Sequence, residues 1–362
     1  EKALRTAAEA DVAVIFAGLP EIFESEGYDR TSMKLPQCQD RLIEEVLKVQ
    51  PNVVVVLHNG SPVELPWADK VSAILEMYLG GQGVGEACDR LLYGEANPSG
   101  RLAETFPYRL EDNPSYLHFP GNGKRVLYGE DIFVGYRYYD TKKVPVRYAF
   151  GHGLSYTEFA YEDLNLSSAQ MTDEDILTVS FKVKNTGKTE GKEVVQLYVA
   201  DLCGISERPV KELKGFAKVH LLPGEEKTVS MEILARDLSY YEERLGDWYA
   251  PSGTYRILIG HASDDIRLHA DVVFETKKKL PLRVDFTTTF GELLDHTKTA
   301  PVITELLAPL AAAAASAEGM SDEYKKLGEQ VIREMPMKSL LGQMPGEQVE
   351  QLIGQLNCLL AQ

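Results

Sequence analysis

The hydrophobic period of this 362-residue chain changes along its length, and this change constrains the fold more than any other feature. Residues 1–110 hold continuous apolar, β-branched runs at 12–17, 53–57 and 73–78. From 159 to 276, apolar residues instead alternate with polar ones. Runs that are apolar throughout are typical of a parallel sheet, whereas alternation is typical of an antiparallel sheet with one solvated face. The sequence therefore predicts two different β-containing domains.

Helical segments separate the apolar runs of the first domain. Apolar residues recur with helical spacing between 36 and 50, where Pro36 suits a first helical turn, and again between 83 and 93. Continuous strands that alternate with helices predict a parallel sheet covered on both faces. Because three strands make a small core, we expect the α/β sandwich domain at residues 1–110 to be incomplete within this sequence.

Residues 111–158 are rich in Tyr, Gly and Pro and have no period, which predicts an extended connector. Aromatic side chains can stack on sugar faces, but they also pack well between domains. We favour packing between domains for the cluster formed by Phe133, Tyr136, Tyr138, Tyr139, Tyr148, Phe150 and Tyr156.

Residues 159–276 contain short alternating strands separated by turn signals such as Asn185-Thr186-Gly187 and Pro251-Ser252-Gly253. This arrangement predicts an antiparallel β-sandwich.

The last segment, residues 277–362, is rich in Ala and Leu and predicts a mainly helical tail. Breaks between its helices are expected at Gly319, Pro336 and Pro345. We expect these helices to pack against the α/β domain or across a subunit interface. The second arrangement would make the protein a homo-oligomer. One face of a packed helix is indicated by the spacing of Val349, Leu352, Ile353 and Leu356.

The formal net charge of −17 limits the partners of the chain. Phosphate groups repel such a chain, which argues against nucleic acid and against an anionic membrane surface as partners. The longest apolar stretch, 306–317, contains Pro309 and is shorter than the roughly 20 residues that a bilayer span requires. Neutral substrates such as sugars remain compatible with this charge.

Four cysteines, Cys38, Cys88, Cys203 and Cys358, lie far apart and are interpreted as free thiols. Free thiols favour a reducing compartment, and together with the lack of a secretion signal they predict a cytoplasmic protein. No spacing of Cys, His or acidic residues is typical of a metal site, and nothing predicts a cofactor.

Other common catalytic motifs are weak or missing. His58 and His152 are isolated, so we expect ordinary hydrogen-bonded histidines. Gly80–Gly85 lies between a strand and a helix but lacks the spacing of a dinucleotide-binding turn, which favours tight helix–sheet packing instead. No Gly-x-Ser-x-Gly nucleophile elbow is found.

The acidic segment Glu21–Arg30 follows the first apolar run directly. In open α/β sheets, the loops after the carboxyl ends of strands form the ligand crevice. Three glutamates within six residues, beside two aromatics, can place a carboxyl in a partly apolar pocket. Such a pocket raises the pKa of a carboxyl, as a general acid at neutral pH requires. A solvated acidic loop is the alternative, since charge runs usually face water.

Six segments, taken together and in order, resemble the β-glucosidases of glycoside hydrolase family 3. They are 24–30 with 35–36, 59–63 with 66–67, 80–102, 150–159, 208–216 and 222–225. The resemblance implies that the sandwich is of fibronectin type III-like type. It also implies hydrolysis of terminal non-reducing β-D-glucosyl residues, in β-glucosides or small oligosaccharides, by a retaining double displacement.

Retaining hydrolysis uses two carboxyl groups about 5–5.5 Å apart, one as nucleophile and one as general acid/base. In family 3 the α/β sandwich domain supplies the acid/base glutamate, which the resemblance places at Glu26. Glu24 is the second candidate, because the alignment can slip by two residues. Asp29 and Arg30 match a structural part of the motif, where we expect an ion pair that shapes the loop.

The sequence departs from the family at the nucleophile, which is an Asp in a Ser-Asp-Trp type motif on a (β/α)8 barrel. The Asp247-Trp248 pair lies inside the sandwich and does not match this motif. The resemblance therefore implies that a separate chain or segment supplies the barrel. Most residues that bind the sugar would lie on it, so substrate-binding residues are not predicted. The alternatives are a non-catalytic scaffold or binding module, or a β-xylosidase or arabinofuranosidase of the same family.

Overall fold

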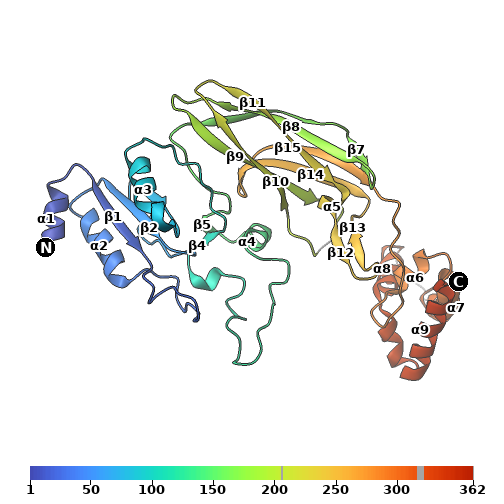
Figure 1. Cartoon of the computed structure of the whole chain (residues 1–362). Helices are drawn as coiled ribbons and strands as arrows, with labels where there is room; N and C mark the ends of the chain where they lie inside the picture. The colour runs from blue at the N-terminus through green and yellow to red at the C-terminus, as the bar shows by residue number, and fades with distance from the viewer. Residues whose placement is uncertain (205–206, 316–321, 362) are drawn as a thin grey trace. The chain divides into compact units, whose positions relative to one another are not determined.

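The computed structural model describes residues 1–204, 207–315 and 322–361 (Figure 1). The chain divides into two compact units. The first comprises Glu1–Tyr240 and Tyr249–Lys277, and the second comprises Tyr241–Trp248 and Lys278–Gln362. None of the helices within the described ranges combines the length and the hydropathy that a membrane crossing needs.

The first unit begins with three parallel strands in the order β1-β2-β3, as the apolar runs predict. The elements are α1 (Lys2–Ala8), β1 (Ala13–Gly18), α2 (Gln37–Leu47), β2 (Val53–His58), β3 (Ala73–Glu76), η1 (Gly81–Gly83) and α3 (Val84–Leu92). Ala13 pairs with Val53, and Val54 pairs with Ala73. All three strands therefore end at the same edge of the sheet.

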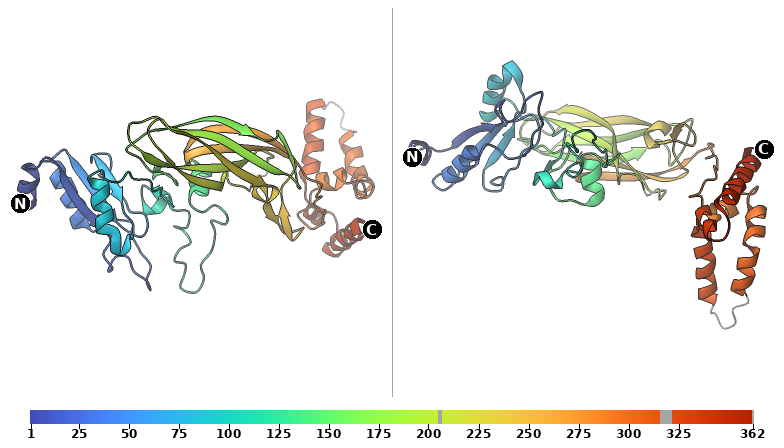
Figure 2. Two further views of the ribbon diagram at one scale, coloured as in Figure 1. Left: turned by 45° about the horizontal axis from the view of Figure 1, so that its top comes forward. Right: turned by 90° about the horizontal axis from the view of Figure 1, so that it is seen from below.

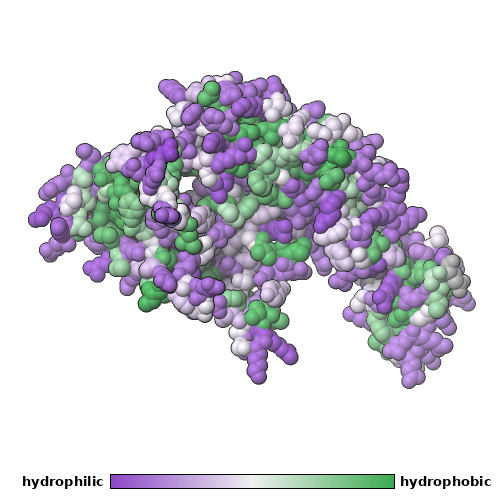
Figure 3. Space-filling model, viewed as in Figure 1, coloured by the Kyte–Doolittle hydropathy of each residue, from purple (hydrophilic) through white to green (hydrophobic). Residues whose placement is uncertain are grey.

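One face of this sheet is covered by α2, whose Ile43 and Val46 belong to the same buried cluster as Val53 and Val55 (Figure 1). The prediction that both faces are covered is wrong for β1, where Val14 is 42% exposed and Phe16 is 60% exposed. Apolar surface over this part of the chain is visible in Figure 3. The apolar run identified a strand correctly, but it did not show what covers each face.

The Gly80–Gly85 segment forms the turn η1 and the start of α3. A Cβ added at Gly81, Gly83 or Gly85 would have no heavy atom within 4 Å. The prediction of tight helix–sheet packing is therefore wrong for these positions.

The connector contains more regular structure than its composition predicts. Its elements are β4 (Phe106–Pro107), η2 (Leu110–Asp112), α4 (Tyr136–Lys142) and β5 (Val146–Tyr148). Residues 113–135 contain no helix or strand and form a long loop that extends away from the sheets of this unit (Figures 1 and 2). The prediction of a purely extended connector is therefore wrong for the residues of α4.

The helix α4 is held by aromatic contacts with the sandwich. The Tyr136 ring stacks on Phe150 with centroids 4.8 Å apart and meets Tyr198 edge-on at 5.8 Å. The Tyr136 hydroxyl accepts a hydrogen bond from the Leu213 N–H at 2.7 Å. These contacts confirm the predicted packing between domains for Tyr136 and Phe150, whereas Tyr156 is 53% exposed.

The sandwich consists of two sheets with strand orders β10-β9-β14-β15-β7 and β11-β8-β6 (Figure 2). Their bounds are β6 (Phe159–Leu166), β7 (Gln170–Thr172), β8 (Ile176–Asn185), β9 (Gly191–Asp201), β10 (Glu212–Leu221), β11 (Glu226–Leu234), β14 (Gly253–Ala262) and β15 (Asp265–Glu275). All pairs are antiparallel except β15 with β7. The alternating residues of both sheets, such as Val179, Phe181, Leu197 and Ile257, form one buried core, as the period of two predicts.

Between β11 and β14 lie the short helix α5 (Ala235–Leu238) and the hairpin of β12 (Tyr240–Glu242) and β13 (Asp247–Tyr249).

The second unit is mainly helical and has its own core, which includes Phe290, Ile303, Val349 and Leu356. Its elements are α6 (Phe290–Asp295), α7 (Ala300–Ala315), α8 (Asp322–Glu334), η3 (Met337–Gly342) and α9 (Gly346–Ala361). The helical tail and the packed face of its last helix are therefore confirmed.

The breaks predicted within this tail have different outcomes. Pro336 and Pro345 lie between elements, as predicted. No break was predicted at Pro309, and α7 continues through it. The predicted break at Gly319 lies outside the described residues.

Candidate active site

The candidate site lies at the carboxyl edge of the parallel sheet, where three strands end side by side. The acidic loop follows β1, the turn Asn59–Pro62 follows β2, and Glu76 is the last residue of β3. Loops at this edge are the usual place for a ligand in an open α/β sheet. The three segments contact one another through the side chains described below.

Glu24 is fixed in place by the turn after β2 and by Arg30. Its Oε2 accepts the Gly60 N–H at 2.6 Å, and its Oε1 accepts the Ser61 hydroxyl at 2.7 Å and Arg30 Nη1 at 3.2 Å. The Glu24 side chain is only 19% exposed. With three donors on its two oxygens, the Glu24 side chain anchors the loop to the turn after β2.

Arg30 forms its ion pair with Glu24 and not with its neighbour Asp29, so the prediction of an Asp29–Arg30 ion pair is wrong. Its guanidinium also donates to the Ser61 hydroxyl oxygen and, from Nη2 at 3.3 Å, to the Pro62 carbonyl oxygen. Asp29 is exposed.

Glu26 lies two residues beyond Glu24 and is exposed. Within the part of the chain that the structure describes, its carboxylate has no hydrogen bond and no ion pair with another side chain. The partly apolar pocket that the sequence suggests for a carboxyl is therefore not built around Glu26 by this chain.

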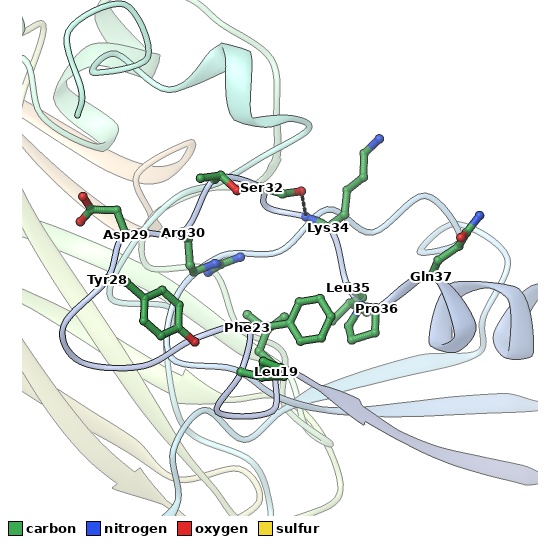
Figure 4. Close-up of a pocket in the computed structure, with 12 residues that line it drawn as sticks. Leu19, Phe23, Tyr28, Asp29, Arg30, Ser32, Lys34, Leu35, Pro36 and Gln37 are labelled. Carbon is green, nitrogen blue, oxygen red and sulfur yellow. Dashed lines mark hydrogen bonds between the residues drawn. The ribbon is translucent and has the colours of Figure 1, made fainter. Parts of the chain in front are cut away.

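A hollow of about 340 Å³ lies beside the same loop (Figure 4). Its walls include Leu19, Phe23, Tyr28, Leu35 and Pro36. Figure 4 shows the Phe23 ring pointing toward Leu35 and Pro36. Neither Glu24 nor Glu26 lines this hollow, which places it next to the candidate carboxylates and not around them.

Two further carboxyl groups lie near this loop. Burial raises the pKa of Glu76 to about 7, although the Tyr78 N–H and the Asn59 amide donate hydrogen bonds to its two oxygens. Burial also raises the pKa of Glu104 to about 7, where the charge of Arg30 opposes the increase and that of Glu24 adds to it. The strand ends thus hold several acidic groups in a partly desolvated environment.

Neither Glu76 nor Glu104 is among the site residues predicted from the sequence. A signal for Glu76 was present, because it is the one charged residue in the apolar run 73–78. Glu104 lies more than 70 residues from the acidic loop, so only the fold brings it into the same environment.

The remaining candidate residues do not form a second catalytic site. No group of three or more metal-ligating side chains is found among the residues that the structure describes. His58 stacks on Phe16, and His152 stacks on Tyr148. Asp247 pairs with Lys278 at 2.8 Å.

Comparison with protein families matches both domains of the first unit. Residues 1–156 match the glycosyl hydrolase family 3 C-terminal domain, and residues 193–263 match a fibronectin type III-like domain. The α/β domain and the sandwich thus define the class of the chain, which is that of the glycosyl hydrolases.

Curated relatives agree with these matches. The thermostable beta-glucosidase B of Acetivibrio thermocellus is 48% identical over 360 residues, which cover 98% of this chain and 47% of that protein. A beta-glucosidase of Kluyveromyces marxianus is 47% identical over 266 residues, which cover 73% of this chain and 31% of that protein. The chain belongs to glycosyl hydrolase family 3, and it spans less than half the length of these relatives.

Solved structures share the fold of most of this chain. The beta-glucosidase of Kluyveromyces marxianus in complex with glucose has a TM-score of 0.72 at 44% identity and covers 76% of this chain and 33% of its own. The family 3 beta-glucosidase of Bifidobacterium adolescentis has a TM-score of 0.76 at 40% identity and covers 83% of this chain and 44% of its own. These likenesses confirm the predicted fold class.

Proposed function

We propose that this chain supplies the general acid/base of a retaining β-glucosidase, and that Glu26 is that group. The observation that carries the proposal is the contrast between two glutamates of one loop. Glu24 already accepts hydrogen bonds from Gly60, Ser61 and Arg30, whereas Glu26 is exposed beyond it. A general acid needs a proton that it can deliver to a substrate, so the exposed carboxyl suits this role better than the anchored one.

The reaction would remove terminal non-reducing β-D-glucosyl residues from β-glucosides or small oligosaccharides in two displacements. Glu26 first donates its proton to the glycosidic oxygen while a carboxylate nucleophile attacks the anomeric carbon. It then takes a proton from the water that attacks the glycosyl-enzyme, which regenerates both groups. Similarity to beta-glucosidases, one of them solved with bound glucose, supports this choice of substrate.

The nucleophile is proposed to be an aspartate on a (β/α)8 barrel supplied by a separate chain or segment. The relatives are two to three times as long as the part that this chain matches, which leaves room for such a barrel. The barrel would also cover Glu26. It would thereby exclude water from the site in which the proton is transferred.

The test begins with the intact mass of everything that co-purifies with the chain. The chain alone, and the chain mixed with the part of the Acetivibrio thermocellus enzyme that it does not match, are then assayed on cellobiose and on a dinitrophenyl β-glucoside. We expect activity only with the added part.

In the active assembly, Glu26→Gln should lower the rate on cellobiose by about 10² to 10⁴-fold. The rate of the first displacement on the dinitrophenyl glucoside should fall much less, because that leaving group needs no proton. A Glu26→Gln assembly with the full rate on cellobiose would refute the assignment. Activity of the chain alone would refute the external barrel.

We also propose a cytoplasmic location. Cys38, Cys88, Cys203 and Cys358 are free thiols, two of them exposed. Exposed free thiols suit a reducing compartment. Fractionation of the native host, with detection of the chain by antibody, tests this location.

A further inference from the structure

The turn Asn59-Gly60-Ser61-Pro62 has no role in the chemistry proposed above, yet it makes most of the contacts to the acidic loop. Its Gly60 N–H and Ser61 hydroxyl both donate to the Glu24 carboxylate, at 2.6 Å and 2.7 Å. Its Pro62 carbonyl accepts from Arg30 Nη2 at 3.3 Å. The turn therefore contacts the loop at two positions, one on each side of Glu26.

Close approach at Gly60 is part of this arrangement. A Cβ at that position would lie 3.1 Å from both Cδ and Oε2 of Glu24. A side chain there would push the Glu24 carboxylate away from the N–H that it now contacts. The absence of a side chain at Gly60 thus permits the short hydrogen bond.

The turn is itself anchored to the end of β3. Asn59 is fully buried, and its Nδ2 donates to the Ser61 carbonyl oxygen at 3.0 Å and to Glu76 Oε2 at 3.2 Å. Glu76 Oε1 accepts the Tyr78 N–H at 2.8 Å. Buried hydrogen-bond chains of this kind hold their members in one arrangement. These hydrogen bonds consequently fix the position of Glu24 relative to the strands β2 and β3.

Glu26 lies between the two anchored residues, two positions after Glu24 and four before Arg30. The Tyr28 hydroxyl adds a third tie, since it donates to the Glu21 carbonyl oxygen at 2.6 Å. With both ends fixed, the segment 25–29 has few conformations available to it.

We propose that Glu24, Arg30 and Ser61 are positioning residues, and that they form a clamp that holds the segment carrying Glu26 over the strand ends. The contribution of this clamp to catalysis rests on the proposed function, in which Glu26 is the acid/base. The clamp itself is a property of the chain alone. A displacement of about 1 Å in a catalytic group can cost about 10²-fold in rate, so the clamp would make a large contribution.

The first experiment tests the clamp without any activity. Amide hydrogen exchange of residues 21–30 is measured by mass spectrometry in the full chain, in Glu24→Ala and in Ser61→Ala. We expect exchange at least tenfold faster in Glu24→Ala and a smaller increase in Ser61→Ala. The matched control is Glu21→Gln, which changes an exposed carboxylate of the same loop and should leave exchange unchanged. Unchanged exchange in both clamp variants would overturn the proposal.

The second experiment separates positioning from catalysis in the active assembly. The pH profile of kcat/KM should lose its alkaline limb in Glu26→Gln, because the titrating acid is gone. Glu24→Gln should keep that limb while kcat falls by about 10²-fold. Loss of the alkaline limb in Glu24→Gln would make Glu24 the acid/base and overturn its positioning role.

The two experiments fail independently. If Glu26→Gln and Glu24→Gln both keep the alkaline limb but hydrogen exchange accelerates in Glu24→Ala, the clamp is supported and the role of Glu26 as acid/base is refuted. If Glu26→Gln loses the limb but exchange does not change, Glu26 stands and the clamp is refuted.

Discussion

The Arg101 guanidinium and the Glu193 carboxylate form a buried ion pair, with 2.6 Å between Nη2 and Oε2. Their side chains are 6% and 0% exposed. The second oxygen of Glu193 accepts the Tyr161 hydroxyl at 2.6 Å and lies 2.6 Å from His261 Nδ1. Arg101 comes from the turn that follows α3, whereas the other three residues lie in the sandwich strands β9, β6 and β14. This cluster therefore joins the α/β domain to the sandwich.

Removal of the Glu193 charge should destabilise the sandwich strongly. Glu193→Gln leaves Arg101 as a buried cation without its counter-ion, which typically costs about 3–5 kcal/mol. Native-state hydrogen exchange of the β9 amides reports the free energy of opening in this region. The matched control is Asp271→Asn, which breaks the exposed pair with Arg256 and should cost less than about 1 kcal/mol. Equal effects of the two substitutions would contradict the structural role of the buried pair.

The stability of the α/β domain should decrease as pH rises from about 4.5 to about 7. Glu76 and Glu104 each have a folded pKa of about 7, raised from 4.5 mainly by burial. The folded state therefore binds protons more tightly than the unfolded state, so this contribution is complete below pH 4.5 and is lost as pH rises through 7. Above that range the contribution of these two groups should be constant.

Replacement of Glu104 by Gln should flatten this pH dependence and stabilise the domain at pH 8 by about 1 kcal/mol, a value reduced for partial exposure. Urea unfolding can be followed by the fluorescence of Trp67, which is fully buried in the α/β core. A Trp248→Phe background leaves Trp67 as the only tryptophan. The control is Glu9→Gln at an exposed site, which should keep the slope. A slope unchanged in Glu104→Gln would show that its carboxyl does not titrate in this range.

The aromatic contacts of α4 provide a prediction for the connector. Tyr136→Phe keeps the stacking on Phe150 but removes the acceptor of the Leu213 N–H, which should cost about 1–2 kcal/mol. Tyr156→Leu, at an exposed ring, also removes one hydrogen bond, from its hydroxyl to the Leu91 carbonyl, but should cost less because water can replace it. Calorimetric transition temperatures of both variants test the difference, and a larger decrease for Tyr156→Leu would refute it.

Local sequence patterns predicted most of the architecture because each pattern reflects a local constraint. The run 53–57 is apolar throughout because β2 lies between β1 and β3 and packs against α2. The run 12–17 identified β1 equally well, although Val14 and Phe16 on its other face are exposed. The period of two in the sandwich likewise follows from its single buried face per sheet. The helix α4 was missed because aromatic contacts with residues such as Tyr198 stabilise it, and such contacts are not visible in a short window.

The candidate site was only partly predictable for the same reason. The acidic loop could be found because it follows an apolar run and because its segments resemble those of a known family. The choice between Glu24 and Glu26 could not be made from the loop, since the partners of Glu24 lie at Gly60 and Ser61. Glu104 enters the same environment only through the fold.

Gly18, the last residue of β1, should be intolerant of any side chain. A Cβ at this position would lie 2.0 Å from the carbonyl oxygen of His58, the residue with which Gly18 is paired in β2. The Gln39 side chain further fixes this point, because it accepts from the Gly18 N–H at 2.9 Å and donates to the Gly18 carbonyl oxygen at 3.0 Å. Neither the strand nor the start of the acidic loop can therefore move without loss of hydrogen bonds.

Gly18→Ala should consequently destabilise the α/β domain by about 1–3 kcal/mol, as overpacking against a rigid backbone does. The same substitution at Gly85, an exposed position in α3 with no atom within 4 Å of an added Cβ, should stabilise the domain by about 0.5–1 kcal/mol. Both effects are measured as shifts of the urea midpoint of Trp67 fluorescence. Shifts of the same sign would contradict the close approach of β1 and β2 at Gly18. Opposite signs would support a close approach of the two strands at Gly18, from which the acidic loop begins.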